Sequence, residues 1–391
     1  MNGTLEGIRV LEMASYVTGP FASVLLADLG ADVIKVEPPG QGDPFRGWGE
    51  NLYSATFRSL NRNKKSITLD IRRDEGRELF LKLASTSDVL IENFRPGTME
   101  RRGIGYDSVR ALNPKIVYCS ISGFGQEGPY RDLPGYDTIG QAMSGLLSLL
   151  TDPDKPQGMG ISLSDHITGI YACYGILGAL VNRMITGEGQ RVETSLLRAT
   201  TSFLSENASR YFETGVVPRR AHRTRTAGVF AFVDQDGLPF VIHVSSPEKF
   251  WRGLLAAVEK PEWADDPRFP DRKSRVENRD ALSDLLQSVF CNGRREEWLQ
   301  RLQKHDVPCA PLNTLEEVFR DPQVQTYGFP VELVHPKMGK MRLVGSGVDL
   351  SRTPAQINVP PPTLGEHTSD VLGSLGYDQE AVEGLKKRKV V

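Results

Sequence analysis

The stretch IRVLEMASYVTGPFASVLLADLGADVIKVE, residues 8–37, decides the fold. Its first six residues are mostly apolar and have the character of a strand, and residues 32–36 form a second such run. Between them, Pro20 stands near the start of a helical pattern and Gly30 follows its end, the usual places of these residues at helix termini. A strand, a helix and a strand in this order predict two parallel strands joined by a right-handed crossover.

The same alternation continues as far as residue 196. Four further strands are predicted, at residues 66–69, 89–91, 116–121 and 192–196. Helical patterns lie between them, at residues 74–84 and 138–150 and in the long apolar run that follows Asp165. We therefore predict an α/β fold with an open, mostly parallel, Rossmann-like sheet and helices on both faces. Ligands of such sheets bind at the carboxyl ends of the strands, near residues 17–20, 37–40, 93–97 and 122–125.

The composition changes near residue 216, which indicates a second domain. Residues 218–225 form a basic, irregular run, and residues 229–233 and 240–244 flank the turn 234–237 as in a β-hairpin. Helical patterns follow, at residues 247–258, 279–290 and 295–305. We predict a large Rossmann-like domain that begins with residues 1–215, a smaller α+β domain at 226–324, and a segment at 325–391 that returns to the large domain.

Composition and charge exclude several classes of protein. The net charge of −2 and the pI of about 6.4 give no electrostatic footprint for nucleic acid. No stretch is apolar enough for long enough to span a membrane, and the first residues lack a signal-peptide pattern. The four cysteines form no C-x-x-C pair and the histidines have no ligand spacing. We expect a reduced, cytoplasmic protein with no metal site and with neither nucleic acid nor membrane as a partner.

The turn after the first strand argues against a dinucleotide cofactor. Glu37 stands where such folds hold a ribose, but residues 15–20 lack the G-x-G-x-x-G pattern, and Pro20 removes an N–H that a pyrophosphate would use. The chain also contains neither a phosphate-binding G-x-x-x-x-G-K-[ST] loop nor a G-x-S-x-G nucleophile elbow. A mechanism based on a carboxylate therefore deserves consideration.

Asp165 is the candidate catalytic residue. Because serines precede it and a long apolar run follows, we expect it in the first turn of a helix, with Ser164 as the N-cap. The free N–H groups and the positive end of the helix dipole would keep its carboxylate ionised at neutral pH. Such a carboxylate can attack an activated carbonyl. An acid at this position more often serves only to stabilise the helix end.

Several segments together resemble the class III coenzyme A transferases, the family of formyl-CoA transferase and carnitine CoA-transferase. They are residues 5–11, 19–20, 26–37, 42–43, 61–67, 88–97, 122–129, 187–192 and 364–368. Each segment alone is a weak signal, whereas their order from one end of the chain to the other is specific. The resemblance implies an enzyme that transfers CoA from an acyl-CoA donor to a carboxylic acid acceptor. CoA thioesters would be its substrates, and no cofactor would be tightly bound.

The resemblance also implies a mechanism and an assembly. Asp165 occupies the position of the family's nucleophile, so it would attack the thioester, form a mixed anhydride and then carry CoA as an aspartyl-CoA thioester. This chemistry needs oxyanion stabilisation and exclusion of water, but no metal and no general base. The family forms a homodimer of interlocked chains, which implies the same for this chain.

Contacts to CoA carry over from the family position by position. They are Val17, Thr18, Leu69, Asp70, Ile71, Arg72, Asn93, Phe94, Arg95, Arg101, Tyr136 and Asp137. The arginines among them suit the CoA phosphates as charged, bidentate donors. Two positions depart from formyl-CoA transferase, which has glutamine at Val17 and arginine at Pro38. Specificity for formyl-CoA and oxalate is therefore not implied.

Two questions stay open in the sequence. The α-methylacyl-CoA racemases are a second branch of the fold that the resemblance implies, but they need a histidine and an aspartate as an acid–base pair. Tyr136 occupies the position of that histidine, which favours transfer, and His166 would point away from its neighbour Asp165 on a helix. In the basic run, Arg223 or Arg225 could reach a dicarboxylic acceptor such as succinate, or both could be solvated in a linker.

Overall fold

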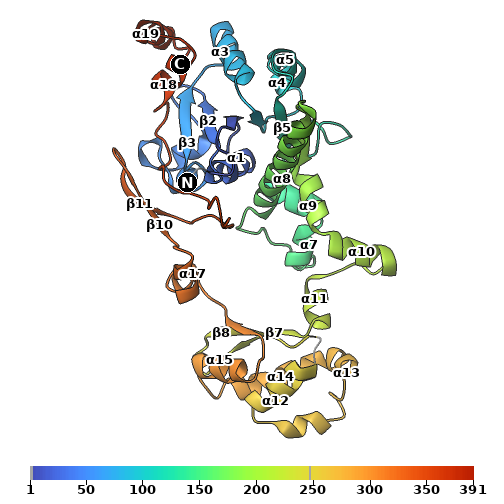
Figure 1. Ribbon diagram of the computed structural model, residues 1–391. Helices are drawn as coiled ribbons and strands as arrows, with labels where there is room; N and C mark the ends of the chain where they lie inside the picture. The colour runs from blue at the N-terminus through green and yellow to red at the C-terminus, as the bar shows by residue number, and fades with distance from the viewer. Residues whose placement is uncertain (1–2, 246–247) are drawn as a thin grey trace. The chain divides into compact units, whose positions relative to one another are not determined.

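The computed structural model describes residues 3–245 and 248–391 (Figure 1). The described chain divides into two compact units. Unit 1 comprises Met1–Leu147, Gly158–Ala208 and Gln325–Val391, and unit 2 comprises Ser148–Gln157 and Ser209–Val324. The chain thus leaves unit 1 for unit 2 and returns to it. None of the described helices is both long and apolar enough to cross a membrane.

Unit 1 is built on a six-stranded sheet with the strand order β3-β2-β1-β4-β5-β6. The strands are β1 (Arg9–Met13), β2 (Asp32–Glu37), β3 (Lys64–Thr68), β4 (Val89–Glu92), β5 (Val117–Ser122) and β6 (Arg191–Ser195). All of their pairings are parallel. The predicted α/β fold is confirmed, and this strand order places the topological switch point between β1 and β4.

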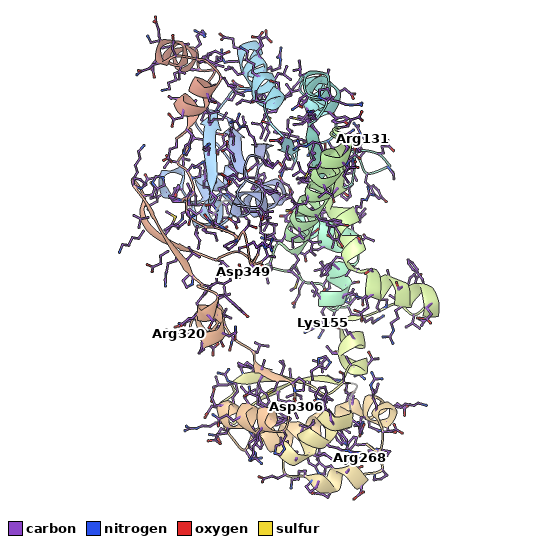
Figure 2. All side chains as sticks on the ribbon, viewed as in Figure 1. Arg131, Lys155, Arg268, Asp306, Arg320 and Asp349 are labelled. Carbon is purple, nitrogen blue, oxygen red and sulfur yellow. The ribbon has the colours of Figure 1, made fainter. Side chains whose placement is uncertain are left out.

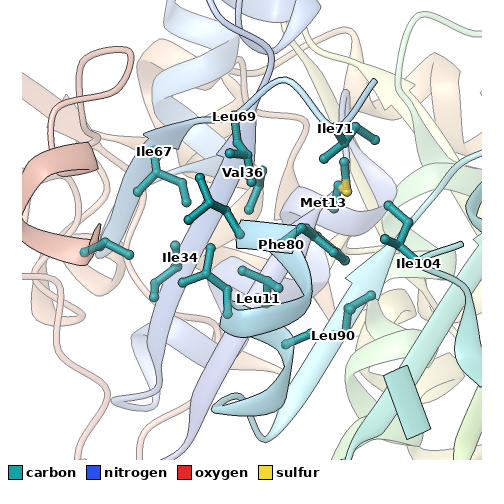
Figure 3. Packing of buried hydrophobic residues seen from close by; sticks show 14 of the residues in the cluster. Leu11, Met13, Ile34, Val36, Ile67, Leu69, Ile71, Phe80, Leu90 and Ile104 are labelled. Carbon is teal, nitrogen blue, oxygen red and sulfur yellow. The ribbon is translucent and has the colours of Figure 1, made fainter. Parts of the chain in front are cut away.

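Apolar side chains cover both faces of this sheet. On one face Leu11, Ile34 and Leu90 pack against α3 (Asp74–Ser85), α5 (Tyr106–Leu112), α18 (Thr368–Ser374) and α19 (Gln379–Lys387) (Figure 3). On the other face their neighbours Val10 and Val33 pack against α1 (Thr18–Asp28) and α8 (Leu163–Thr186). Since successive strand residues point to opposite faces, burial of both faces requires the continuous apolar runs seen in the sequence.

Some helix boundaries differ from the sequence predictions. Helix α8 begins at Leu163 with Ser162 as its N-cap, because the hydroxyl of Ser164 is buried and lies 2.7 Å from Thr200 Oγ1. The predicted helix at 138–150 is two helices, α6 (Asp137–Met143) and α7 (Leu146–Leu150), since Gly145 between them has a φ of 87°. Helix α19 was not predicted.

Unit 2 has its own core. Strands β7 (Val229–Val233), β8 (Pro239–His243) and β9 (Cys309–Pro311) form an antiparallel sheet. The apolar faces of α12 (Glu248–Ala257), α14 (Arg279–Phe290) and α15 (Arg295–Lys304) pack with it around a buried aromatic cluster. Part of the basic run expected to be irregular is instead a helix, α11 (Arg220–Thr226).

Shorter elements complete the two units. The hairpin β10 (Val331–His335) and β11 (Gly339–Leu343) belongs to unit 1. The remaining helices are η1 (Pro44–Trp48), η2 (Glu50–Leu52), α2 (Ala55–Leu60), α4 (Thr98–Arg101), α9 (Leu196–Phe203), α10 (Ser205–Thr214), η3 (Pro261–Asp265), α13 (Arg272–Glu277), α16 (Leu315–Val318) and α17 (Pro322–Thr326).

Candidate active site

A cavity of about 190 Å³ opens at the carboxyl ends of β1, β4 and β5. Its walls include residues 16–18 after β1, residues 93–96 after β4, and Ser122 and Gly123 at the end of β5. Strands β1 and β4 are neighbours whose connections run to opposite faces of the sheet, so the loops that follow them separate. The cavity therefore lies where a sheet of this topology binds its ligands.

Asp165 lines the same cavity from the first turn of α8. Its carboxyl is partly buried, and burial together with the negative charge of Asp137 raises its pKa to about 7. The expectation of a fully ionised carboxylate at neutral pH is wrong, because these two effects outweigh the helix end. Asp165 therefore binds a proton much more tightly than an ordinary aspartate does.

A second carboxylate is fixed beside the backbone of Asp165. Asp137, the first residue of α6, accepts the backbone N–H of Asp165 through Oδ1 at 3.1 Å. Its other oxygen accepts a hydrogen bond from the buried side chain of Gln141, which also donates to the carbonyl of Ile161 at 3.0 Å. These contacts join the starts of α6 and α8 and hold a negative charge near the candidate nucleophile.

The activity should depend on pH through Asp165. We expect kcat/KM to rise about tenfold per pH unit below pH 7 and to level off above it, because only the ionised carboxylate attacks. The folded protein binds this proton more tightly than the unfolded chain, so the contribution of Asp165 to stability decreases as pH rises from about 4 to 7. Asp137→Asn removes a charge that raises the pKa, so the midpoint of the pH–rate profile should move to lower pH.

Glu92 provides the matched control for this pH profile. Burial also raises its pKa to about 7, and it accepts the backbone N–H of Phe94 at 2.9 Å, but it does not line the cavity. Glu92→Gln should leave the midpoint in place. If the midpoint moves in Glu92→Gln but not in Asp137→Asn, the titrating group is Glu92 and not Asp165, which would contradict the prediction.

Asn93 fixes the loop that follows β1. Its Oδ1 accepts the backbone N–H of Ser15 at 2.9 Å, and its Nδ2 donates to the carbonyl of Ser15 at 2.7 Å and to Thr18 Oγ1 at 3.1 Å. The side chain of Val17 packs in a separate apolar cluster with Phe45. The amide of Asn93 therefore connects the loops after β1 and β4 across the switch point.

The structure brings only part of the expected CoA contacts to the cavity. Val17, Thr18, Asn93, Phe94, Arg95 and Tyr136 line it together with Asp165. Arg101 in α4 lies close to Arg131, which lines the cavity. A Cβ atom placed on Gly97 would touch both guanidinium groups, at 2.9 Å from Arg101 Nη1 and 3.3 Å from Arg131 Nη2.

The expected contacts at residues 69–72 lie outside the cavity wall. Leu69 and Ile71 are buried in the core that covers one face of the sheet. Asp70 binds the exposed Arg72, with 2.7 Å between Oδ1 and Nε. Their contacts to CoA stay predictions.

Two cavity residues were not singled out in the sequence. Arg131 lies on the loop after β5 (Figure 2), and its Nε donates to the carbonyl of Gln126 at 2.8 Å, which orients the guanidinium. Tyr16 follows β1 and has a φ of 64°. Both are single residues without a spacing pattern, so their only signal was their position next to segments of the resemblance.

His166 is held away from the cavity. Its Nδ1 lies 2.7 Å from the carbonyl of Ser162, and its ring contacts the edge of Phe21 with centroids 4.7 Å apart. It does not line the cavity wall, and its purely structural role stays a prediction. Among the residues that the structure describes, no histidine lines the cavity with Asp165, whereas racemisation needs a histidine and an aspartate as an acid–base pair.

The arginines of the basic run belong to unit 2. Arg223 and Arg225 lie in α11, and Arg225 pairs with Asp280, with 2.9 Å between Nη2 and Oδ2. A role for either arginine in binding the acceptor stays a prediction.

Comparisons with known proteins match the chain over nearly its full length. The family model described as CoA-transferase family III matches residues 5–368. The chain is 38% identical over 384 residues to succinate–glutarate CoA-transferase from Agrobacterium fabrum, covering 95% of both chains. It is 35% identical over 394 residues to succinyl-CoA–D-citramalate CoA-transferase from Chloroflexus aurantiacus, covering 99% of this chain and 98% of that one. The crystal structure of a CaiB/BaiF family protein from Brucella suis matches with a TM-score of 0.85 and 36% identity, covering 96% of this chain and 100% of that one.

Proposed function

Because the chain belongs to CoA-transferase family III, we propose that it transfers CoA from an acyl-CoA to a dicarboxylic acid through a thioester on Asp165. The observation that carries this proposal is the position of Asp165. Its carboxyl lines a cavity at the switch point of the sheet, next to the loops that the family resemblance assigns to CoA. A nucleophile at this position meets a ligand that enters along the carboxyl ends of the strands.

The proposed reaction balances without an external proton donor. The Asp165 carboxylate attacks the thioester carbonyl, the C–S bond breaks, CoA leaves as a thiolate, and a mixed anhydride between Asp165 and the acyl group remains. The thiolate then attacks the Asp165 carbonyl carbon and releases the donor acid, which leaves an aspartyl-CoA thioester. The acceptor carboxylate attacks this thioester, and the same two steps run in reverse onto the acceptor. Asp165 ends as a carboxylate, ready for the next cycle.

The side chains around Asp165 suit a large anionic substrate. We propose that CoA binds along residues 16–18 and 93–96, with Tyr136 beside Tyr16 on the cavity wall. Arg95 lines the cavity and Arg101 lies near its wall, where their guanidinium groups can bind phosphate as bidentate donors. The proposed contact of Asp137 is indirect, because its carboxylate is engaged with Asp165 and Gln141.

Two cationic side chains favour an acceptor with a second carboxylate. Arg95 and Arg131 both line the cavity that contains Asp165. Two related enzymes are named for succinate, glutarate and citramalate, all of which have two carboxylates. One carboxylate of such an acceptor would attack the Asp165 thioester while a guanidinium holds the other. A charge-assisted hydrogen bond of this kind contributes about 1.5–3 kcal/mol.

Paired acceptors of equal chain length test this proposal. We expect kcat/KM for succinate to exceed that for butyrate by about 10- to 100-fold, because only succinate has a distal carboxylate. Glutarate and valerate form a second pair. With glutaryl-CoA as donor for the first pair and succinyl-CoA as donor for the second, each product differs from its donor, and the new thioesters are separated and quantified by mass spectrometry. Equal values for butyrate and succinate would rule out recognition of a second carboxylate.

We also propose that two copies of the chain form a homodimer. Helix α8 exposes Ile170, Tyr174, Val181, Met184 and Ile185, each with more than half of its surface accessible. An apolar stripe of this size on one helix is typical of a protein–protein contact. Sedimentation equilibrium would show a dimer, and replacing Met184 with Asp should weaken it. A monomer at all concentrations would contradict the proposal.

A further inference from the structure

Tyr16 has a backbone conformation that a large side chain rarely adopts. Its φ of 64° lies in the left-handed region, where glycine is free and an aromatic residue is strained. The strain costs on the order of 1–3 kcal/mol and persists only where the surroundings enforce it. Such conformations gather at functional sites, and Tyr16 lines the cavity of Asp165. A glycine would fit this backbone better, so the side chain must supply something that glycine cannot.

Three anchors hold the strained loop. Asn93 binds the backbone N–H and the carbonyl of Ser15, immediately before Tyr16. Lys35, which is fully buried, donates to the carbonyl of Ala14 at 2.8 Å. The backbone N–H of Tyr16 itself points to Oδ1 of the buried Asp43, at 3.4 Å. These hydrogen bonds fix the backbone of residues 14–16 and so hold Tyr16 in its position.

The ring of Tyr16 is placed as part of an aromatic wall. Its edge contacts are with Phe45, at a centroid distance of 5.4 Å, and with Tyr136, at 6.0 Å, both at an angle of 88°. Tyr16 and Tyr136 both line the cavity, and Tyr136 is next to Asp137, whose carboxylate binds the backbone of Asp165. Burial and the phenol of Tyr136 raise the pKa of Tyr16, so its hydroxyl stays neutral.

We propose that the ring of Tyr16 keeps water away from the intermediates on Asp165 and so decides between transfer and hydrolysis. The inference rests on the proposed function. Water that attacks the aspartyl thioester breaks the C–S bond and gives the Asp165 carboxylate, CoA thiol and one proton. The free energy of the thioester is then lost without transfer. The cavity is open to solvent, so water can reach Asp165 unless side chains at the wall limit its access. An aromatic ring fixed at the wall supplies this protection.

The partition between hydrolysis and transfer is the measurement. Release of CoA thiol from succinyl-CoA without acceptor gives the hydrolysis rate, and formation of glutaryl-CoA with saturating glutarate gives the transfer rate. Tyr16→Ala and Tyr16→Gly should raise the ratio of hydrolysis to transfer by about tenfold or more. Tyr16→Phe keeps the ring and should hold the ratio near that of the wild type. Tyr16→Gly also fits the backbone without strain, so this variant remains foldable if Tyr16→Ala does not.

Glu259→Gly is the matched backbone control. Glu259 has a φ of 57° and lies in unit 2, so glycine there relieves the same kind of strain away from the cavity wall. Its partition ratio should equal that of the wild type. A folded Tyr16→Gly enzyme with an unchanged ratio, or a Tyr16→Phe enzyme as leaky as Tyr16→Ala, would overturn the inference and leave the role of Asp165 intact. A wild-type chain that transfers no CoA would overturn the proposed function and this inference with it.

Discussion

Replacing Asp165 with asparagine should lower the rate of CoA transfer by about 10⁴-fold or more, as expected when a catalytic nucleophile is removed. Asparagine has nearly the same shape, but its amide cannot displace a thiolate and form an anhydride. Because the residues that line the rest of the cavity are unchanged, the affinity for acyl-CoA should stay within about threefold, a difference of less than 1 kcal/mol. Rapid-quench transfer assays and calorimetric titration with CoA measure the two quantities separately.

Asp165→Glu distinguishes a lost nucleophile from a displaced one. Glutamate keeps the carboxylate but moves it by one methylene, and a misplacement of about 1 Å costs about 10²-fold in rate. We therefore expect its activity to lie between those of the wild type and Asp165→Asn. An asparagine variant that transfers CoA within tenfold of the wild-type rate would remove Asp165 from the role of nucleophile.

Replacing Glu12 with glutamine should destabilise the fold by about 3–5 kcal/mol, because it breaks a buried ion cluster. Glu12 in β1 is fully buried and binds the ammonium groups of Lys35 at 2.7 Å and Lys64 at 2.8 Å, both of which are also fully buried. Burial alone would raise the pKa of Glu12, but the two lysines outweigh it and lower the pKa to about 2. The variant leaves two buried cations without this carboxylate. Urea unfolding gives the change in free energy.

The pH dependence of stability provides an independent check on Glu12. Its pKa in the folded protein lies below its ordinary value of 4.5, so its contribution is complete above pH 4.5 and is lost as pH falls towards 2. Glu12→Gln should therefore lose less stability than the wild type between pH 4.5 and 2.

Glu383→Gln is the control for this ion cluster. Glu383 pairs with Lys386 at 2.8 Å, and both side chains are about half exposed. Its loss should change stability by less than about 1 kcal/mol. If Glu12→Gln and Glu383→Gln lower the free energy of unfolding by the same amount, the buried ion cluster does not stabilise the fold as predicted. Lys35 also binds the carbonyl of Ala14, in the loop that carries Tyr16 to the cavity. Loss of Glu12 should disturb this contact, so we expect the Glu12→Gln enzyme that remains folded to turn over more slowly as well.

Much of unit 1 could be predicted from the sequence for a physical reason. A sheet covered on both faces favours apolar residues on both sides of each strand, as in Val10 and Leu11, which belong to different core clusters. The ends of helices were harder to predict from the sequence. The glycine at 145 ends α6 only because its φ is positive, and Ser164 does not cap α8 because its hydroxyl reaches Thr200 instead.

The location of the candidate site could be predicted from the sequence, but the pKa of its carboxyl group could not. The position of Asp165 in a first helical turn followed from local sequence, and the family resemblance is confirmed by the match over residues 5–368. Its raised pKa did not follow, because it depends on burial and on Asp137, which is far away in sequence. Tyr16 was missed for a similar reason, since its loop is anchored by Lys35, Asp43 and Asn93, which are far away in sequence.

A covalent intermediate can be observed directly. The enzyme is mixed with succinyl-CoA without acceptor, quenched in acid within one turnover, digested and analysed by mass spectrometry, with Asp165→Asn as the blank. The account predicts that the peptide containing Asp165 gains the mass of CoA and loses it when glutarate is added before the quench. An unmodified Asp165 peptide in an enzyme that is transferring CoA, or a CoA adduct on another residue, would contradict it.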